Sequence, residues 1–271
     1  MNFSEIKLVV IDIDGTLLDN DRRLHPETMR VIEEVQKQGI TVTLASGRTF
    51  ISTARIARQL KIKAPIIAHG GAYIARVTDD EPLYEAPMDM NEARELVALL
   101  EASGYYVKVY IRDELYVQVV TEETLEFCSQ HGIYYRVVGS GNLSELDKNP
   151  LKIVVIDTPQ GINHVYKLLE PWKTKFNICR DTDRGVEIVK RNVNKGTAME
   201  KVCAMLKVEK NQVMAFGNEG NDLDLIKNAG LGVAMGNAYA ELKKYAAIVT
   251  RSNEDLGVAY VLEKYLLKNL N

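Results

Sequence analysis

The segment from Leu8 to Asp19 constrains the fold of this chain more than any other part of it. It reads Leu-Val-Val-Ile-Asp-Ile-Asp-Gly-Thr-Leu-Leu-Asp, an apolar run that ends in two aspartates spaced two apart. Such a run is typical of a buried parallel strand that carries carboxylates to the carboxyl-end edge of a sheet. Because strand side chains have a period of two, we expect Asp12 and Asp14 to leave on roughly the same side. Gly15 permits the tight turn that must follow.

Two carboxylates held this close repel each other unless a positive charge lies between them. A hard divalent cation such as Mg²⁺, which prefers oxygen ligands, is the simplest partner. The same D-x-D pattern also occurs in plain turns, where the Asp side chain accepts hydrogen bonds from the backbone. Other metal-binding or catalytic residue types at neighbouring strand ends would favour a metal site over a plain turn.

Composition narrows the class of protein. The chain has 271 residues, enough for two domains with a core each, and a formal net charge of -3. There is thus no global basic field for nucleic acid or an anionic membrane, and the apolar runs are too short to span a bilayer. Cys128, Cys179 and Cys203 are far apart and fit no metal-ligand pattern. With no signal-peptide pattern at the N-terminus, we expect a cytoplasmic protein with structural thiols.

Strand and helix patterns alternate in the first section of the chain. Pro26 opens a helical pattern that stops at Gly39, which matches the usual placement of proline and glycine at helix ends. Strands are predicted at 7–12, 40–45 and 65–68, and helices at 26–39 and 49–60. This series predicts the α/β class, with a doubly wound parallel sheet and right-handed connections.

The pattern changes after His69-Gly70-Gly71, where short strands predict a hairpin. From 87 to 189 helices and adjacent strands alternate without regular crossovers, which indicates a separate α+β domain with antiparallel pairing. The strand-helix series then resumes at 195 and continues to the terminal helix predicted at 254–267. We therefore expect a core domain at 1–86, an inserted cap domain at 87–189, and the rest of the core at 190–271.

Four short motifs follow strands or open helices of the predicted core. They are Asp12 to Thr16, Ser46-Gly47-Arg48, Lys195-Gly196, and Gly217 to Asp222. Because the carboxyl ends of parallel strands meet at one edge, we expect the four motifs to lie together. Each has a local alternative: Ser46 as a helix cap, Lys195 as a solvated lysine, and Asp222 as the cap of the next helix. As a set they supply a carboxylate pair, a hydroxyl, a lysine and a second cluster of metal ligands.

In this order the motifs resemble those of the haloacid dehalogenase superfamily of phosphohydrolases, and the resemblance covers essentially the whole chain. The inserted α+β segment resembles the larger cap type of that superfamily. The run Asn-Ala-Gly-Leu-Gly-Val-Ala-Met-Gly-Asn-Ala at 228–238 is similar to the Cof-type subgroup of bacterial sugar-phosphate phosphatases.

The resemblance implies an aspartyl-phosphate mechanism. Asp12 is then the nucleophile, and Asp14 is the general acid and base, for which a raised pKa is expected at some stage. Mg²⁺ binds the Asp12 carboxylate and the main-chain carbonyl of Asp14. Ser46 hydrogen-bonds a phosphoryl oxygen, and Lys195 neutralises charge and restrains Asp12. We expect further contacts with phosphate from Thr16, Gly47, Arg48 and Asn221, and with the metal from Asn218 and Asp222.

Two positions depart from the family pattern. The family usually has Asp where this chain has Asn218, so we expect a working site with weaker Mg²⁺ affinity. Gly70 stands where related sequences often carry Asn. The neighbouring His69 is expected to be structural, as a lone histidine at a strand end usually is. Neither difference touches the proposed nucleophile or acid.

The sequence predicts a phosphomonoesterase for small phosphorylated metabolites, sugar phosphates first among them, with the cap as a lid that sets specificity. We expect a monomer or weak homo-oligomer. Tyr106, Tyr110 and Tyr116 in the cap are expected to be fillers rather than sugar platforms. A phosphosugar mutase on the same core is an alternative, and a phosphometabolite-binding regulator without catalysis is another, favoured by Asn218. A nucleotide-binding dehydrogenase is disfavoured because no G-x-G-x-x-G follows the first strand.

Overall fold

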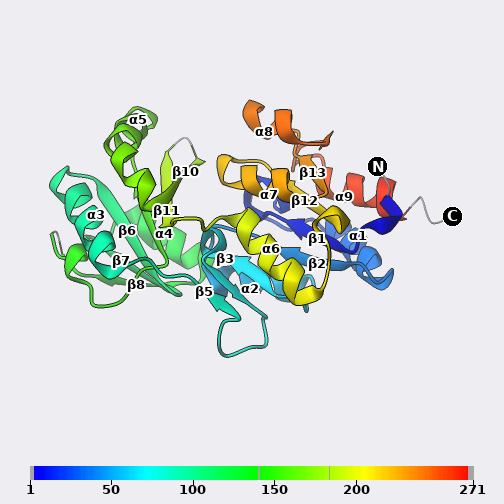
Figure 1. Cartoon of the computed structure of the whole chain (residues 1–271), viewed down its shortest axis with the longest axis horizontal. Helices are drawn as coiled ribbons and strands as arrows, with labels where there is room; N and C mark the ends of the chain where they lie inside the picture. The colour runs from blue at the N-terminus through cyan, green and yellow to red at the C-terminus, as the bar shows by residue number, and fades with distance from the viewer. Residues whose placement is uncertain (1–2, 140, 183, 268–271) are drawn as a thin grey trace.

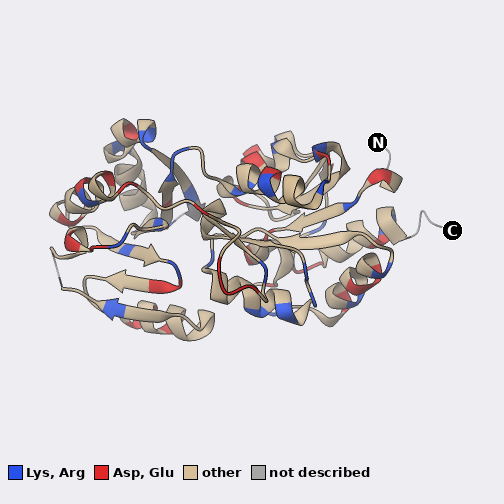
Figure 2. Cartoon of the chain, turned by 60° about the horizontal axis from the view of Figure 1, so that its bottom comes forward, with Lys and Arg blue, Asp and Glu red and all other residues tan. Residues whose placement is uncertain are grey.

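A computed structural model of the protein describes residues 3–139, 141–182 and 184–267. Two lobes lie side by side along the long axis of the molecule, and the lobe on the right of Figure 1 contains both ends of the chain. Lys, Arg, Asp and Glu are mixed over both lobes in Figure 2, without a broad face of one sign. The positive charge that an anionic substrate needs therefore has to come from particular residues.

The right-hand lobe is built on a five-stranded parallel sheet in the order β14-β13-β12-β1-β2 (Figure 1). The bounds of these strands are Ile248–Val249, Leu231–Ala234, Val213–Gly217, Leu8–Ile11 and Thr41–Leu44. Each residue of β1 is 0% exposed, which explains its unbroken apolar sequence. Strand β2 lies on one side of β1, and β12, β13 and β14 lie on its other side. The strand order therefore reverses at β1. The predicted doubly wound α/β fold is confirmed.

Helices cover this sheet. Their bounds are α1 Pro26–Lys37, α2 Phe50–Gln59, α6 Lys195–Leu206, α7 Leu223–Asn228, α8 Ala240–Tyr245 and α9 Gly257–Leu262. Helix α1 begins at its proline, as predicted, and the side chain of His25 accepts a hydrogen bond from the N–H of Glu27. Helix α1 packs against α9, and α6 packs against α7. No helix in the described part of the chain is long and apolar enough to cross a bilayer.

One predicted strand has a different partner. The segment 65–68 forms β3 (Ile66–Ala68), but an isolated parallel bridge between Ala45 and Ile67 is its link to β2 among the described residues. It pairs antiparallel with β4 (Tyr73–Ala75), which pairs with β5 (Tyr84–Glu85). The reason is the turn at His69–Gly71, where three successive residues have φ of 50°, 64° and 108° and reverse the chain at once. A Cβ on Gly71 would collide with the backbone of Asn194, so glycine is required there.

The other lobe, called the cap below, is built on a six-stranded sheet in the order β10-β11-β9-β6-β7-β8, the cap sheet. The lobe with the parallel sheet is called the core. The bounds are Phe176–Thr182, Gly185–Lys190, Lys152–Ile156, Tyr106–Ile111, Glu114–Val117 and Tyr134–Val137. Neighbouring strands are antiparallel, as predicted, apart from β7 and β8, which are parallel. Helix α4 (Glu122–His131) connects those two strands, and a helical crossover brings the chain back in the same direction.

The two faces of this sheet have different roles. Helices α3 (Met90–Ala102) and α5 (Pro159–Leu168) pack on one face, against side chains such as Val107, Val109 and Ile153. Because side chains alternate along a strand, the intervening residues of β6 and β9 point to the opposite face. That face carries Tyr110 and Val154, and Ile51 of α2 in the other lobe packs against it. The sheet therefore presents one face to α3 and α5, and the other to α4 and the core.

Smaller differences from the predicted elements occur at strand and helix ends. Helix α8 was not predicted, and the terminal helix begins at Gly257 instead of 254 because residues before it form turns that end with Leu256 at φ 54°. Strand β7 ends at Val117. Helix α5 begins at Pro159, with Thr158 as its cap. None of these shifts moves a predicted site residue off its sheet edge.

Candidate active site

Asp12 directly follows β1 and is almost buried, with 4% of its surface exposed. Its main-chain N–H donates to the carbonyl of Phe216 in β12 at 3.1 Å, so pairing between neighbouring strands fixes its place at the sheet edge. The chain then turns at Gly15, whose φ of +71° suits glycine, as the sequence predicted. The motif after β1 therefore forms a tight turn with a buried carboxylate at its start.

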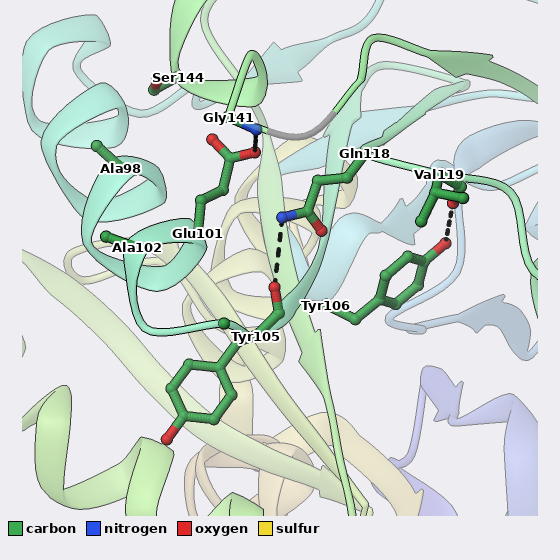
Figure 3. A pocket seen from close by; sticks show the side chains of 10 residues that line it. Ala98, Glu101, Ala102, Tyr105, Tyr106, Gln118, Val119, Gly141 and Ser144 are labelled. Atoms are coloured by element: carbon green, nitrogen blue, oxygen red, sulfur yellow. Dashed lines mark hydrogen bonds between the residues drawn. The ribbon is translucent and has the colours of Figure 1, made fainter.

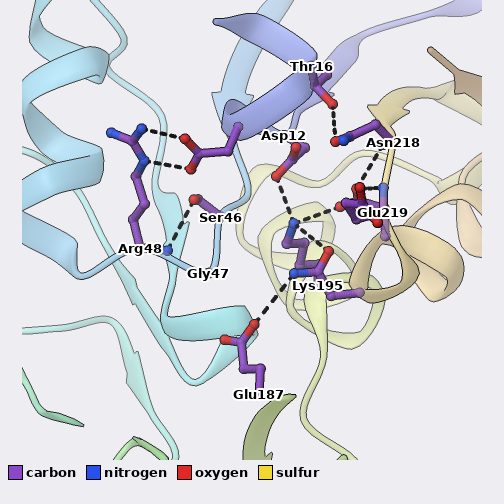
Figure 4. A network of polar contacts seen from close by, with 12 residues as sticks. Asp12, Thr16, Ser46, Gly47, Arg48, Glu187, Lys195, Asn218 and Glu219 are labelled. Carbon is purple, nitrogen blue, oxygen red and sulfur yellow. Dashed lines mark hydrogen bonds and ion pairs between the residues drawn. The ribbon is translucent and has the colours of Figure 1, made fainter. Parts of the chain in front are cut away.

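Lys195 contacts the carboxylate of Asp12 directly (Figure 4). Its Nζ lies 2.7 Å from Asp12 Oδ1 and 2.7 Å from Asp222 Oδ1, and it donates to Asn221 Oδ1 at 3.2 Å. The Lys195 side chain is 2% exposed, so it is not the solvated lysine of the alternative interpretation. Asn194 caps α6 with a capping box and thereby holds the first helical turn in place. Three of the four predicted motifs thus meet at one ammonium group.

The charges of this cluster are not balanced. Burial raises the pKa of Asp12 to about 7, and the negative charge of Asp222 acts in the same direction, although Lys195 opposes both. Burial alone lowers the pKa of Lys195, but the two carboxylates outweigh it and hold that pKa above its ordinary value. Two buried carboxylates around one ammonium leave an excess of negative charge, which favours a further cation.

Asp222 has a full set of protein partners. Its Oδ1 accepts from Lys195, and its Oδ2 accepts from the main-chain N–H groups of Asn218 at 2.9 Å and Glu219 at 3.0 Å. The side chain is 0% exposed. We predicted Asp222 as a metal ligand or a holder of metal-bound water, whereas this geometry makes it the residue that ties the loop after β12 to Lys195.

The side-chain amide of Asn218 lies among three oxygens. One amide atom is 2.9 Å from Thr16 Oγ1, 3.2 Å from Asp12 Oδ2 and 2.9 Å from the main-chain oxygen of Asp14. An NH₂ group at that place can share its two hydrogens among these oxygens, whereas an amide oxygen would face the acceptors Asp12 Oδ2 and the Asp14 carbonyl, so the hydrogen-bond network assigns the nitrogen there. Asp12 Oδ2 and the Asp14 carbonyl oxygen therefore converge on one point, which suits a hydrogen-bond donor or a cation.

These oxygens fit Mg²⁺. Among the described residues, no three His, Cys, Asp or Glu side chains group as a metal site. The donors here are mixed: a carboxylate of Asp12, the main-chain carbonyl of Asp14 and, after rotation of its amide, the oxygen of Asn218. All are hard oxygen donors, which Mg²⁺ accepts. The amide takes the place of one negative charge, as expected from the sequence.

Asn218→Asp is expected to tighten Mg²⁺ binding by about tenfold or more, because a charged ligand replaces a neutral one. Without Mg²⁺ the variant is expected to be less stable than the wild type, since a third carboxylate then joins Asp12 and Asp222. Calorimetric titration with Mg²⁺ and thermal unfolding in a chelator measure the two effects. Asn91→Asp, in the exposed first turn of α3, is the matched control. An unchanged affinity would contradict the assignment of Asn218 to the metal.

Asp14 and Arg48 form a bidentate ion pair (Figure 4). The Arg48 nitrogens lie 2.7 Å and 2.5 Å from the two carboxylate oxygens. Burial raises the pKa of Asp14, but the hydrogen bonds and charge of Arg48 outweigh it, so this pKa lies below its ordinary value. In this state the pKa of Asp14 is therefore lowered, and Arg48 is paired with a carboxylate. The raised pKa expected of Asp14 at some stage and the substrate contact expected of Arg48 stay predictions.

The remaining predicted residues lie around this cluster. Ser46 is 1% exposed, and its Oγ accepts from the N–H of Arg48 at 3.1 Å, whereas the cap position of α2 belongs to Thr49. Ser46 is therefore not the helix cap of the alternative interpretation. The carbonyl oxygen of Gly47 accepts from Lys152 of β9. Thr16 contacts Asn218, so neither Gly47 nor Thr16 is without a protein partner in this state.

Two charged residues of the cap sheet were missed by the sequence analysis. Glu187 of β11 is 1% exposed and Lys152 of β9 is 6% exposed, and they form an ion pair at 3.3 Å. Glu187 also accepts from Asn221 Nδ2 at 3.4 Å (Figure 4). A signal was present, because each is a charged residue in a mostly apolar strand. The sequence does not show which face of the cap sheet meets the core, so it could not show that these two charges lie beside the active site.

A separate hollow of about 520 Å³ lies in the cap, between the end of α3 and β7 (Figure 3). Its lining includes Tyr106, whose hydroxyl donates to the carbonyl of Val119, and Glu101, which accepts from the N–H of Gly141. No residue of the Asp12 cluster lines it. Tyr110 and Tyr116 are buried at 3% and 7% exposure, and Tyr110 lies on the face of the cap sheet that meets the core.

Comparison with known proteins gives the family. The profile of the haloacid dehalogenase-like hydrolases matches residues 9–262. The stress response protein YhaX of Bacillus subtilis (strain 168) is 34% identical over 270 residues, which cover 96% of this chain and 93% of that protein. The 5-amino-6-(5-phospho-D-ribitylamino)uracil phosphatase YitU of the same bacterium is 26% identical, with 95% and 97% covered. A haloacid dehalogenase-like hydrolase structure from B. subtilis has a TM-score of 0.87 at 25% identity and covers 97% of this chain and 100% of its own.

The fold and the comparisons define this protein as a hydrolase of phosphomonoesters. The chain belongs to the haloacid dehalogenase-like hydrolase family, whose profile spans nearly its whole length. The resemblance predicted from the four motifs is thereby confirmed.

Proposed function

We propose that this protein is a Mg²⁺-dependent phosphatase for small phosphorylated metabolites, with sugar phosphates as first candidates. The observation that carries the proposal is the position of the buried Asp12 carboxylate and the contacts of its two oxygens. One of its carboxylate oxygens contacts the buried ammonium of Lys195, and the other faces the point shared by Asn218 and the Asp14 carbonyl. The name of the relative YitU, a phosphatase for a phosphorylated ribityl compound, supports a hydroxylated phosphate ester.

In the proposed reaction Asp12 attacks the phosphorus atom of the ester. A bond forms between its carboxylate oxygen and phosphorus while the bond from phosphorus to the leaving oxygen breaks, and Asp14 donates a proton to that oxygen. Water then attacks the phosphorus of the aspartyl phosphate, Asp14 takes its proton, and phosphate leaves with Asp12 regenerated. Lys195 holds Asp12 in place, and Ser46 donates to a phosphoryl oxygen.

When bound, Mg²⁺ supplies positive charge that offsets repulsion between the Asp12 carboxylate and an anionic phosphate. The residues that hold it are Asp12 through its carboxylate, Asp14 through its main-chain carbonyl, and Asn218. The excess of carboxylates over ammonium groups around Lys195 supports this need for a cation.

The ion pair between Asp14 and Arg48 has to open before Asp14 can act as the acid. While Arg48 donates to both oxygens, the Asp14 carboxylate stays ionised and has no proton to give. A phosphate group that enters the site offers Arg48 a competing anion. We therefore propose that substrate binding releases Asp14 for proton transfer.

We further propose that residues 87–189 act as a lid on a core formed by 1–86 and 190–271. Several contacts join the two lobes in this state: Lys152 to the Gly47 carbonyl, Glu187 to Asn221, and His131 of α4 to Ser52 of α2 at 3.1 Å. These contacts support a closed arrangement, which excludes water from the first chemical step.

His131→Asn is expected to make stability less sensitive to acid. Burial, together with the charge of Arg48, lowers the pKa of His131 from 6.5 to about 3. The unfolded chain therefore binds a proton between these values that the folded protein does not, so this contribution is present above pH 6.5 and is lost as the pH falls. Urea unfolding between pH 7.5 and pH 4.5 measures it. Equal pH slopes for the wild type and variant would contradict the shift.

Removal of Mg²⁺ tests the proposed function. Phosphate release is measured with a panel of sugar phosphates and with phenyl phosphate, before and after treatment with a chelator. We expect turnover to fall by at least about a hundredfold without Mg²⁺ and to return when Mg²⁺ is added back. Turnover unaffected by the chelator would refute the metal requirement.

One observation favours a second candidate, a binding protein without catalysis. Asn218 removes a charge from the metal site and its amide already satisfies the oxygens there. Tight binding of a sugar phosphate without turnover at high Mg²⁺ would establish this alternative.

We infer a cytoplasmic location as well, supported by the absence of disulfides among Cys128, Cys179 and Cys203. The oligomeric state, a monomer or weak homo-oligomer, stays a prediction.

A further inference from the structure

Glu187 is a cap residue that borders two motifs of the core. It accepts from Asn221 Nδ2 at 3.4 Å, and Asn221 in turn accepts from Lys195, the residue that contacts Asp12. On its other side it is paired at 3.3 Å with Lys152, which donates to the carbonyl oxygen of Gly47. The carboxylate is thus placed beside both the Lys195 cluster and the loop that carries Ser46.

The glycines of the core make room for this carboxylate. A Cβ added to Gly47 would lie 3.1 Å from Glu187 Oε2, and one added to Gly70 would lie 2.7 Å from Oε1. A side chain at Gly70 would therefore collide with Glu187 unless that carboxylate shifted, and the φ of 64° there also favours glycine.

This corner of the site contains polar atoms whose hydrogen-bonding capacity is unused. Glu187 Oε1 is buried and, apart from its ion pair with Lys152 at 3.3 Å, has no hydrogen-bond partner among the described residues. His69, next to Gly70, is 0% exposed, and neither of its ring nitrogens has a hydrogen-bond partner in the described part of the chain. Buried polar groups are normally paired, so such a cluster beside a reaction centre indicates a polar ligand. A neutral imidazole offers one donor and one acceptor, and a carboxylate offers acceptors.

The local charges limit what that ligand can be. Carboxylates of Asp12, Asp14, Asp222 and Glu187 outnumber the cations that pair with them, which are Lys195, Arg48 and Lys152. Lys152 is already bound by Glu187 and Gly47, so it is not free to receive a second anion. A second phosphate or carboxylate on the substrate would meet the Glu187 charge at close range, whereas hydroxyl groups would find acceptors.

We propose that Glu187, held by Lys152, selects the leaving group of the ester. It accepts hydrogen bonds from the hydroxyl groups of an uncharged sugar or polyol, with His69 as a second polar contact, and it repels leaving groups that carry another anionic group. This inference rests on the proposed phosphatase function and adds to it the part of the ester that the cap recognises.

Glu187→Gln tests the proposal with two kinds of ester. Glucose 6-phosphate has a hydroxylated leaving group, and phenyl phosphate has one without hydroxyls. We expect the variant to lose roughly 10- to 100-fold in kcat/KM for glucose 6-phosphate, because a charged acceptor is lost, and less than about threefold for phenyl phosphate. Fructose 1,6-bisphosphate is expected to inhibit the variant more strongly than the wild type, by about fivefold or more. Glu114→Gln, at an exposed cap ion pair with Arg136, is the matched control.

A second variant separates selection from folding. Glu187→Gln leaves the Lys152 ammonium without its carboxylate, so the double variant Glu187→Gln/Lys152→Met removes both charges together. It is expected to show the same selective loss for glucose 6-phosphate. An equal loss on both esters in the two variants would overturn the proposal while leaving the phosphatase function intact. If the wild type hydrolyses neither ester, the function fails and the proposal fails with it.

Discussion

Asp12→Asn is expected to abolish hydrolysis of phosphate esters, by at least about a thousandfold, because the carboxamide is not a competent nucleophile toward phosphorus. The fold is expected to persist, since the Lys195 ammonium keeps its contact with Asp222 at 2.7 Å. Removing one of two crowded carboxylates is expected to leave stability unchanged or increased. Single-turnover phosphate release and thermal unfolding on the same preparation measure both effects.

Asp21→Asn is the matched control for this experiment. The Asp21 side chain is 69% exposed and lies on the loop after the β1 turn, paired with Arg23. Its turnover is expected to stay within about twofold of the wild type. Residual activity in Asp12→Asn above about a tenth of the wild type would exclude Asp12 as the nucleophile.

Lys195→Met is expected to have the largest combined effect. The change leaves Asp12 and Asp222, both buried and both 2.7 Å from Nζ in the wild type, without their cation. Loss of one partner from a buried ion pair costs about 3–5 kcal/mol of folding free energy. Turnover is expected to fall at least about a thousandfold as well, because in the proposed mechanism Lys195 holds the nucleophile and neutralises charge on the phosphate. Urea unfolding and phosphate release measure the two losses.

A double variant distinguishes the two roles of Lys195. In Lys195→Met/Asp222→Asn one of the stranded carboxylates becomes neutral, so part of the lost stability is expected to return. Turnover is not expected to return, because the cation beside Asp12 is still absent. Recovery of activity in the double variant would show that Lys195 acts through the fold alone.

The core of this fold was predictable because its strands are buried on both faces. Such strands read as unbroken apolar runs, so β1 and β12 and the motifs after them could be placed on one edge from the sequence. The meeting of Asp12 and Lys195 follows from that topology, although 183 residues separate them along the chain. Local pattern and global topology point to the same arrangement here.

Other parts of the site depend on contacts that no local pattern encodes. The pair of Asp14 and Arg48 arises because the turns after β1 and β2 bring two flexible side chains together, and the sequence does not specify that meeting. The ion pair of Glu187 and Lys152 depends on strand register, since Lys152 is paired with Val189 and Val154 with Glu187. It depends also on which cap face meets the core. The strand at 65–68 was predicted, but its pairing with β4 was not, because three left-handed residues in succession reverse the chain.

The connection from β11 to α6 is short, and it joins the cap strand of Glu187 to the core helix of Lys195. Three residues, 191–193, separate the end of β11 from Asn194, which caps α6 and donates to Asp224 at 2.7 Å. Glu187 therefore lies in the cap sheet, while Lys195 is anchored to the core a few residues later. If the cap opens as proposed, Glu187 leaves the site with it and Lys195 stays beside Asp12. Under the proposal, substitutions in the cap strands are thus expected to change which ester is accepted without changing the residues that carry out hydrolysis.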